Sequence, residues 1–395
     1  MKRAHRLCML VHGPYPLSEG RVVAQALAAL DAGWQVDVVA ARYPGEPAEE
    51  IVDGVAVFRL PLSHEWGAGA FAVAREYLGF AALATAKVAA LAARRRYEVI
   101  HVHNPPDFLM LAALAPRLLG AGVIFDVHDF APELFAMRFA GCNGLPAMEW
   151  ALRLVERLAT CFATGVITVH EPYRRALKAR GVPADKITVV LNSVDERLLP
   201  AAAPPAERNG FRVVYHGTIT PHYGVELLVE AAARSAREVP DLSLEIYGDG
   251  DALPAVQSRV GELGLSERVH MSGRFLPQRE VLERVRSASA GVICNLPIER
   301  NETAIPTKLF EYAALGVPIV TADLLAIREY FSPQEVRFFR AGSADQLAEV
   351  LREVAAAPDA AEARALAARQ RYDEYRWPVS ARRYVELLER LSSAA

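Results

Sequence analysis

The chain has 395 residues, of which 52% are apolar and 23% charged, and its formal net charge at pH 7 is −3. This length exceeds what one hydrophobic core usually serves, so we expect two domains. Positive and negative side chains are nearly balanced in each half, which argues against the basic footprint of a nucleic-acid-binding protein.

Cysteine spacing and hydropathy indicate where the protein resides. The cysteines are widely separated and form no CxxC pair: Cys8, Cys142, Cys161 and Cys294. This spacing favours free thiols in a reducing compartment, the cytoplasm, over a disulfide framework or a zinc site. The basic start is interrupted by His12-Gly13-Pro14 too early for a signal peptide. The most apolar stretch, residues 67–93, contains Arg75, Glu76 and Lys87, so we do not expect it to span a membrane.

Short β-branched runs alternate with longer Ala/Leu-rich helical stretches, which is typical of parallel sheets covered by helices on both faces. We predict strands at residues 7–11, 35–40, 55–60, 99–102, 123–127, 165–169 and 187–190, and then at 212–216, 242–247, 269–271, 290–294, 318–321 and 336–339. An alanine–proline run at residues 200–205 separates two similar halves. The expected fold is therefore α/β, with two Rossmann-like, doubly wound domains at residues 1–200 and 201–377 and ligands in the crevice between them.

Polar residues in the first half follow predicted strands or begin a helix. Gly20 and Arg21 precede a long helix, where a solvated arginine is the ordinary interpretation. His103 and Asn104 end one strand, and His128 follows the next. A lone histidine is usually a structural hydrogen-bonding residue, whereas the carboxyl end of a parallel strand is a common ligand site. Both interpretations remain open for His128.

Glycine-rich loops follow two strands of the second half. Gly217 comes directly after strand 212–216, and Gly224 opens the next helix, so this loop is either a phosphate-binding turn or a tight strand-to-helix connection. Gly248-Asp-Gly-Asp251 has the form of a metal-binding DxD, but a turn followed by a helix cap explains it without a metal. We therefore expect no metal ion.

The segment from Ile305 to Val320 is the most informative part of the chain. Pro306 suits the start of a helix, Gly316 its end, and Pro318 prevents its continuation, which places Glu311 inside a helix of about three turns. Thr307 and Lys308 lie at the amino-terminal end, where unpaired N–H groups and a lysine favour a phosphate. This helix therefore offers a pyrophosphate-binding site beside a carboxylate that can accept hydrogen bonds from ribose hydroxyls. A nucleoside diphosphate sugar requires both.

This segment resembles the signature of family four of the retaining glycosyltransferases, and the resemblance extends over nearly the whole chain. Glu311 matches the second glutamate of the family's two-glutamate motif, which binds the donor's ribose. The position of the first glutamate is occupied by Thr303, with Glu299 and Glu302 close by. The sequence is most similar to the branch that reads "PTK, two residues, EY" and builds bacterial exopolysaccharides and related glycans.

The resemblance implies the GT-B fold, with the helix of residues 378–395 returning to the first domain. It implies donor-binding roles for Gly20, Gly217, Thr218, Gly248, Arg274, Phe275, Thr303, Thr307, Lys308 and Glu311. The expected catalytic residues are His128, Glu302 and Lys308, and the expected acceptor-binding residues are Arg21, His103 and Asn104. Thr218 and Tyr223 replace the family's usual arginine and lysine in the glycine loop, so Lys308 is the candidate substitute as phosphate ligand.

The expected activity is metal-independent, retaining transfer of a hexose-type sugar to a hydroxyl of a glycan, lipid-linked or small-molecule acceptor. The donor would be a nucleoside diphosphate sugar, foremost a UDP-sugar, and no separate cofactor is expected. A nucleotide-sugar epimerase or hydrolase of the same fold and a non-catalytic nucleotide-sugar-binding partner remain alternatives. Arg94, Arg95 and Arg96 could contact anionic lipid at the inner face of the membrane, although they also suit a helix end.

Overall fold

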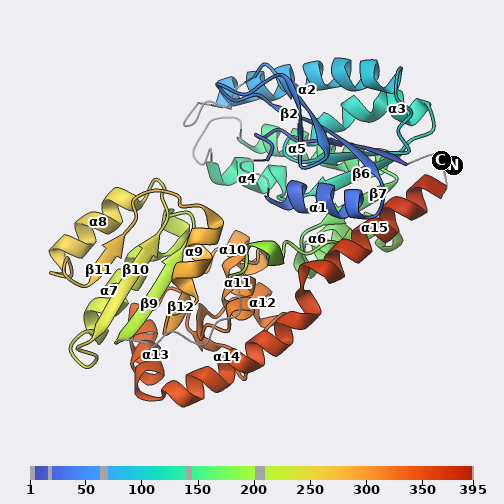
Figure 1. The fold of residues 1–395 in the computed structure, drawn as a ribbon. Coiled ribbons are helices and arrows are strands. Elements are labelled where there is room, and N and C mark those ends of the chain that lie inside the picture. Colours follow the sequence, from blue (N-terminus) through green and yellow to red (C-terminus); the bar gives the residue numbers. More distant parts are fainter. Residues whose placement is uncertain (1–4, 17–19, 63–69, 139–144, 201–209, 394–395) are drawn as a thin grey trace. The chain divides into compact units, whose positions relative to one another are not determined.

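The computed structural model describes residues 5–16, 20–62, 70–138, 145–200 and 210–393 (Figure 1). The chain forms two compact units, residues 1–192 with 378–395 and residues 193–377. The first division thus falls eight residues (200 − 192) before the boundary predicted at residue 200. Most of the predicted linker, residues 201–205, lies outside the described residues.

The first unit contains an eight-stranded sheet in the order β3-β4-β2-β1-β5-β6-β7-β8. Its strands are β1 (Arg6–Leu10), β2 (Gln35–Ala41), β3 (Glu49–Val52), β4 (Val55–Leu60), β5 (Val99–His103), β6 (Gly122–Val127), β7 (Gly165–Thr168) and β8 (Ile187–Val189). All pairings are parallel except that of β3 with β4. The sequence analysis missed β3, an edge strand whose residues are exposed or half-buried and therefore lack a buried apolar run.

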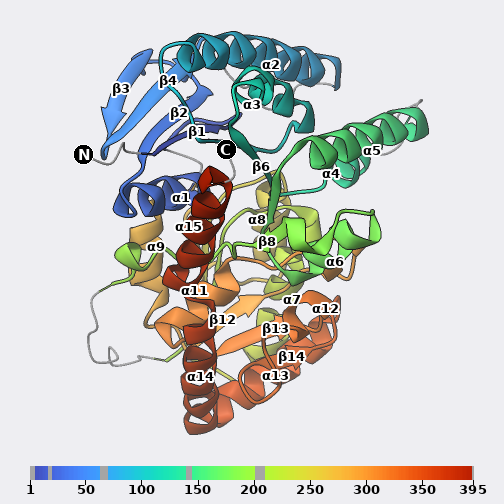
Figure 2. The same ribbon diagram turned by 90° about the vertical axis from the view of Figure 1, so that its right-hand side faces the viewer.

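Helices cover both faces of this sheet (Figure 2). The helical segments are α1 (Gly20–Asp31), α2 (Ala70–Ala92), η1 (Asp107–Ala113), α3 (Leu114–Leu118), α4 (Ala131–Arg138), α5 (Leu145–Phe162), α6 (Glu171–Ala179) and α15 (Trp377–Ser393), with short turns η2 (Ala184–Lys186) and η3 (Glu196–Leu198), the latter in the second unit. The helix predicted to return to the first domain is α15, in which Tyr384, Leu387, Leu388 and Leu391 are buried. Leu387 and Leu391 lie against Gly165, where a larger residue would not fit without a shift.

The second unit contains a six-stranded parallel sheet in the order β11-β10-β9-β12-β13-β14. Its strands are β9 (Phe211–His216), β10 (Leu242–Tyr247), β11 (Val269–Met271), β12 (Ala290–Ile293), β13 (Ile319–Ala322) and β14 (Arg337–Phe339). Its helical segments are η4 (Pro221–Tyr223), α7 (Val225–Ser235), α8 (Leu253–Glu262), α9 (Gln278–Val285), α10 (Glu299–Thr303), α11 (Lys308–Leu315), α12 (Leu325–Arg328), α13 (Ala344–Ala356), α14 (Pro358–Tyr372) and η5 (Asp373–Tyr375). The prediction of two doubly wound parallel sheets is confirmed.

The described cysteines Cys8, Cys161 and Cys294 are free thiols; Cys142 lies outside the described residues. Within the described part of the chain, no helix is both long and apolar enough to cross a membrane. Asp251 was expected to cap α8, but Ala252 occupies the cap position and no side chain caps this helix.

Gly224 offers a direct test of how tightly β12 packs against the loop after β9. Gly224 and Gly264 have nearly the same left-handed φ, +67° and +66°. A Cβ at Gly224 would lie 2.2 Å from the carbonyl oxygen of Cys294, whereas a Cβ at Gly264 would meet no atom within 4 Å. The two sites therefore share the backbone strain of an L residue but differ in steric clash.

We expect Gly224→Ala to lower the free energy of unfolding by about 1–3 kcal/mol more than Gly264→Ala, because only the first substitution overpacks the structure. Denaturant unfolding of both variants measures this difference. Equal losses would mean that the loop moves away from Cys294 without penalty.

Candidate functional site

The helix α11 carries the two charged residues that the sequence analysis singled out. It spans Lys308–Leu315, beginning two residues later than Pro306, and is thus shorter than predicted. Gly316 ends it with a φ of +67°, as expected for a glycine C-cap. Lys308 and Glu311 are one turn apart and both are buried, with only 7% and 5% of their surfaces exposed.

The ammonium group of Lys308 lies against aromatic rings and a glycine. Its Nζ atom is 3.8 Å from the ring centroid of Tyr215 and 5.5 Å from that of Tyr223, which are cation–π positions. A Cβ at Gly217 would come within 3.3 Å of Nζ, so the absence of a side chain there leaves the backbone beside the cation. Burial lowers the pKa of Lys308 to about 8.

The carboxylate of Glu311 is held by two side chains. Gln278 Nε2 donates to Oε1 at 2.8 Å, and His216 Nε2 lies 3.1 Å from Oε2. Burial raises the pKa of Glu311 and lowers that of His216 to about 3, so the imidazole is neutral at pH 7. The sequence analysis missed both partners. His216 ends β9 directly before Gly217, which was the available signal, whereas nothing in the sequence marked Gln278.

The glycine loops pack backbone against backbone. A Cβ at Gly248 would lie 1.9 Å from the carbonyl oxygen of Gly217, and one at Gly250 would lie 2.2 Å from that of Ile219. Ser272 joins the next loop to this pair, because its Oγ accepts from the Gly248 amide at 2.9 Å and donates to the Arg274 carbonyl at 2.8 Å. The structure therefore brings the loops after β9, β10 and β11 together.

Other predicted donor-binding residues are placed differently. Thr218, Arg274, Phe275 and Thr307 are exposed. The Thr303 hydroxyl donates to the Glu299 and Arg300 carbonyls within α10. The carboxylate of Glu302 accepts a hydrogen bond of 2.9 Å from the Leu325 amide. Leu325 is the first residue of α12, so Glu302 bonds to the start of this helix. The geometry thus gives Glu302 and Thr303 structural contacts and offers no support for their expected sugar-facing roles.

The helix α10 nevertheless brings a second basic group near the glycine loop. Asn301 Nδ2 donates to the carbonyls of His222 and Leu296, which fixes α10 against η4. Arg300 Nη1 lies 3.1 Å from His222 Nε2, and the adjacent Tyr223 faces Lys308. Arg300 and His222 were not predicted. Arg300 partly restores the positive character that Thr218 and Tyr223 remove from this loop, whereas burial and the charge of Arg300 lower the pKa of His222.

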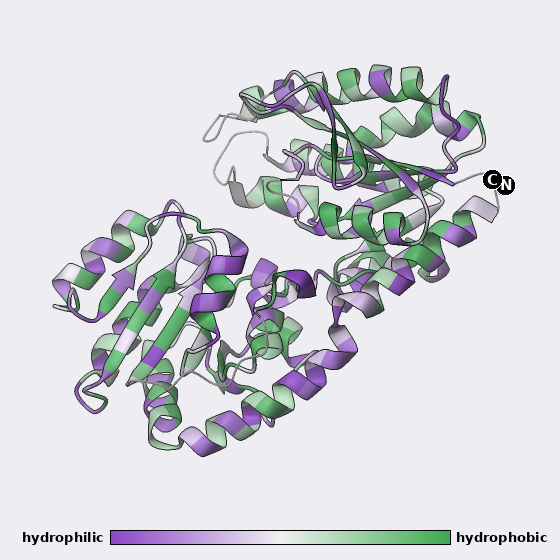
Figure 3. Ribbon diagram, in the orientation of Figure 1, coloured by the Kyte–Doolittle hydropathy of each residue, from purple (hydrophilic) through white to green (hydrophobic). Residues whose placement is uncertain are grey.

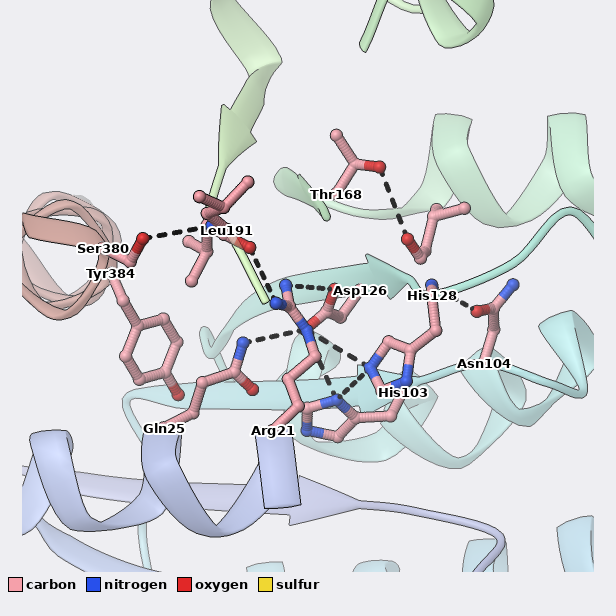
Figure 4. Close-up of polar contacts among 12 residues, drawn as sticks. Arg21, Gln25, His103, Asn104, Asp126, His128, Thr168, Leu191, Ser380 and Tyr384 are labelled. Carbon is pink, nitrogen blue, oxygen red and sulfur yellow. Dashed lines mark hydrogen bonds and ion pairs between the residues drawn. The ribbon is translucent and has the colours of Figure 1, made fainter. Parts of the chain in front are cut away.

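A second polar cluster lies in the first unit, around Asp126 at the end of β6 (Figure 4). Arg21 donates from Nε and Nη2 to the two carboxylate oxygens of Asp126, both at 3.1 Å, and from Nη1 to the Val190 carbonyl at 2.7 Å. Gln25 Nε2 adds a bond of 2.9 Å to Asp126. Burial alone would raise the pKa of Asp126, but the charge of Arg21 and hydrogen bonds from histidines hold it well below its usual value.

Three histidines surround the same carboxylate. His101 Nε2, His103 Nδ1 and His128 Nε2 each lie 3.5 Å from Asp126 Oδ2, and His103 Nδ1 is 3.0 Å from His128 Nε2. Burial lowers the pKa of His101 and His103, so both are neutral at pH 7. His128 alone retains appreciable exposure, with 18% of its side chain accessible. Asn104 holds the His128 amide through Oδ1 at 2.7 Å.

The residues expected to bind the acceptor are buried. Arg21, His103 and Asn104 are bonded to neighbouring groups of the first unit, and their acceptor-binding role stays a prediction. Gly20 is the first residue of α1, and Ser18 and Glu19 beside it lie outside the described residues. The sequence could not reveal that Arg21 pairs with a residue 105 positions away.

His101, His103 and Asp126 are close enough together to be considered as metal ligands. The guanidinium of Arg21 and the amide of Gln25 already occupy the carboxylate oxygens of Asp126. A metal ion would therefore have to displace these donors and lie beside a fixed positive charge, which disfavours a cation here.

The shifted pKa of Lys308 leads to a test of its burial. The folded-state pKa of about 8 lies below the ordinary lysine pKa of 10.5, so between these pH values the unfolded chain holds a proton that the folded protein has lost. The free energy of unfolding should therefore gain up to about 3 kcal/mol from this group as pH rises through that window. Lys308→Met has no group that titrates here and should lack this gain. The free energy of unfolding of the unchanged protein should therefore rise relative to that of the variant between pH 7 and pH 10. Denaturant unfolding of both proteins across pH 7–10 measures it, and a pH-independent difference would show that Lys308 is solvated.

Comparisons with known proteins agree with the two-unit architecture. Residues 20–193 match the family model described as "Glycosyl transferase 4-like domain", and residues 202–371 match "Glycosyl transferases group 1". An alpha-D-kanosaminyltransferase of Streptomyces kanamyceticus is 26% identical over 253 residues, which are 60% of this chain and 63% of that protein. The match therefore spans less than two thirds of that relative's length.

Solved structures share the fold. Sucrose-phosphate synthase from Thermosynechococcus elongatus superimposes with a TM-score of 0.80 at 18% identity, covering 99% of this chain and 100% of that one. HepE from Anabaena in complex with UDP gives a TM-score of 0.70 at 18% identity, covering 98% of this chain and 100% of that one. With both of its units matched in chain order by glycosyltransferase family models, the chain belongs to the GT-B glycosyltransferases of the family 4 type.

Proposed function

We propose that this protein transfers a sugar from a UDP-sugar to an acceptor hydroxyl, with retention of anomeric configuration and without a metal ion. One observation carries the proposal: a buried lysine and a buried glutamate lie one turn apart on α11, beside the glycine loop after β9. A diphosphate requires the cation, and a ribose offers hydroxyls to the carboxylate. A buried cation and a buried carboxylate at this spacing can bind both the diphosphate and the ribose of a nucleoside diphosphate, which neither group could do alone.

The phosphate end of the donor would bind between Lys308 and the loop that begins at Gly217. A bound diphosphate would further favour the protonated form of Lys308, because a nearby negative charge raises a lysine pKa that burial has lowered to about 8. Arg300 and His222, held 3.1 Å apart beside this loop, would supply further donors. These groups would compensate for Thr218 and Tyr223, which cannot bring positive charge.

The ribose end would bind at Glu311. Both carboxylate oxygens already face protein groups, Gln278 on Oε1 and His216 on Oε2. Gln278 lies at the exposed start of α9, so its amide can give way to a ribose hydroxyl while His216 keeps the carboxylate oriented. The exposed loop at Arg274 and Phe275, tied to Gly248 through Ser272, would then lie against the nucleobase.

The chemistry we propose relies on electrostatic stabilisation of the leaving group. The bond between the anomeric carbon and the phosphate oxygen breaks, the acceptor oxygen bonds to that carbon on the same face, and the acceptor proton passes to the departing phosphate. Lys308 would stabilise the negative charge that develops on that phosphate. His128, the accessible member of the Asp126 cluster, would support the transferred sugar.

UDP is the proposed nucleotide because structures of the same fold contain it. HepE from Anabaena has been crystallised with UDP and with UDP-glucose. The identity to those chains is too low to carry over the sugar, so the proposal names the nucleotide and leaves the sugar open.

We expect Glu311→Ala to weaken UDP binding on the order of 10- to 100-fold, because it removes hydrogen bonds to a charged acceptor. Lys308→Met should weaken UDP by a similar factor but leave uridine nearly unchanged, since uridine lacks the diphosphate. Titration calorimetry of UDP and uridine with the unchanged protein and with both variants measures these affinities, with Glu349→Ala as a control that alters an exposed glutamate of the same unit. Equal losses for UDP and uridine in Lys308→Met would remove Lys308 from the phosphate site.

The activity itself is tested by product analysis with a panel of nucleoside diphosphate sugars and acceptors. We expect an acceptor-dependent glycoside whose anomeric configuration matches that of the donor, formed equally well in the presence of EDTA. Free sugar or an isomerised donor formed without any acceptor would instead indicate a hydrolase or an epimerase. Tight donor binding without turnover of any acceptor would indicate a non-catalytic binder.

A further inference from the structure

The outer side of α2 lacks the polar face that a surface helix normally has. Its inner residues Val73, Phe80, Val88 and Leu91 are buried in the core of the first unit. The exposed positions of the described helix are almost all apolar as well: Phe71, Ala74, Leu78, Ala82, Leu83, Ala86 and Ala90, with Arg75 as the exposed charge. A helix that is apolar all round is usually covered on every side.

Exposed apolar residues continue over the neighbouring helices. In η1 and α3 they are Leu111, Leu114 and Leu118, the last with 80% of its surface exposed, followed by Leu119. In α5 they are Met148, Trp150, Leu154 and Leu158, with Trp150 68% exposed. Most of the exposed large apolar side chains in the described part of the chain thus lie on α2, η1, α3 and α5 of the first unit.

These helices form one continuous surface. The segment η1 contacts both α2 and α5, and α2 also contacts α3. Figures 1 and 2 place α2, α3 and α5 on the same side of the sheet, opposite α1 and α15, and Figure 3 shows their largely apolar colouring. We call the outward side of α2, η1, α3 and α5 the apolar face.

The face has a positive border. At 100° per residue, the exposed side of α5 places Arg153 and Arg157 on one flank, Trp150 and Cys161 along the centre, and Leu154 and Leu158 on the other flank. The residues Arg94 and Arg96, just beyond α2, are also exposed. This arrangement of Trp, Leu and Arg on one helix is characteristic of helices that lie in a membrane interface.

Acidic residues of the same helices offset this charge only at Arg153, which pairs with Glu149. Glu76 contacts His12 at 3.0 Å with only 9% of its side chain exposed, and Asp107 is buried. Glu156 is buried and accepts from Arg180 at 2.6 Å, while Glu149 accepts from Arg153 at 2.8 Å. The described outer surface of these helices therefore combines apolar side chains with net positive charge.

We infer that the apolar face docks on the surface of an anionic lipid membrane. The charge favours anionic headgroups, and the exposed Trp and Leu side chains suit the acyl boundary. Arg75, Arg94, Arg96 and Arg157 are exposed. The one acidic residue of these helices with more than a tenth of its side chain exposed, Glu149, pairs with Arg153, so the charge complements an anionic surface. The inference concerns the first unit alone and does not depend on the proposed glycosyl transfer.

The test is co-sedimentation of the full chain with phosphatidylcholine vesicles that contain or lack phosphatidylglycerol. We expect at least about tenfold stronger partitioning to the anionic vesicles, weakened by added salt. The triple substitution Trp150→Ser, Leu154→Ser and Leu158→Ser should lower that partitioning about tenfold or more, because it removes the apolar anchors. The single substitution Arg157→Glu should weaken binding to anionic vesicles without affecting the little that binds to neutral ones.

The control is Leu325→Ser with Leu366→Ser, two exposed leucines of the second unit, which should leave partitioning unchanged. Thermal unfolding of each variant confirms that the fold is retained. Absence of binding to anionic vesicles, or undiminished binding of the triple variant, would overturn the inference. Sedimentation equilibrium provides a further outcome: a dimer that the triple variant abolishes, without vesicle binding, would assign the face to a second copy of the chain.

Discussion

The burial of Lys308 and Glu311 on one turn of α11 is the constraint on which the proposed donor site depends. Burying a charged group is unfavourable unless neighbouring groups compensate for the lost water, so each charge needs neighbours that can pair with it or hydrogen-bond to it. Tyr215 and Gly217 offer Lys308 an aromatic face and an open backbone. Gln278 donates a hydrogen bond to Glu311, and His216 lies beside its other oxygen. The lowered pKa of Lys308 and the raised pKa of Glu311 show that burial is only partly compensated. A ligand that brings phosphate to one group and hydroxyls to the other would complete the compensation.

The first unit solves a similar problem differently. Asp126 keeps its charge because Arg21 and Gln25 bind its oxygens, and burial lowers the pKa of His101 and His103. The result is a closed network in which His128 alone reaches an accessible surface. The second unit leaves its charges ready for a ligand, whereas the first uses its charges to hold a single imidazole in place.

Much of the fold follows from the sequence because its signals are local. Short apolar runs predicted the other strands, whereas the residues of β3 are exposed or half-buried and form no buried run. Gly316 marked the end of α11, and the position of Glu311 within that helix followed. The site was less predictable because its partners are distant in sequence. Arg21 meets Asp126 across 105 positions and Gln278 meets Glu311 across 33, and no local pattern records either pair.

The central claim is that Lys308 holds the diphosphate and Glu311 the ribose of one bound nucleotide. A crystal structure of the protein with UDP tests it most directly. The account predicts a ribose hydroxyl within about 3 Å of a Glu311 oxygen and a phosphate oxygen within about 3 Å of Lys308 Nζ, with Gln278 displaced from Glu311. A nucleotide bound elsewhere, or one whose phosphates lie away from Lys308, would contradict it.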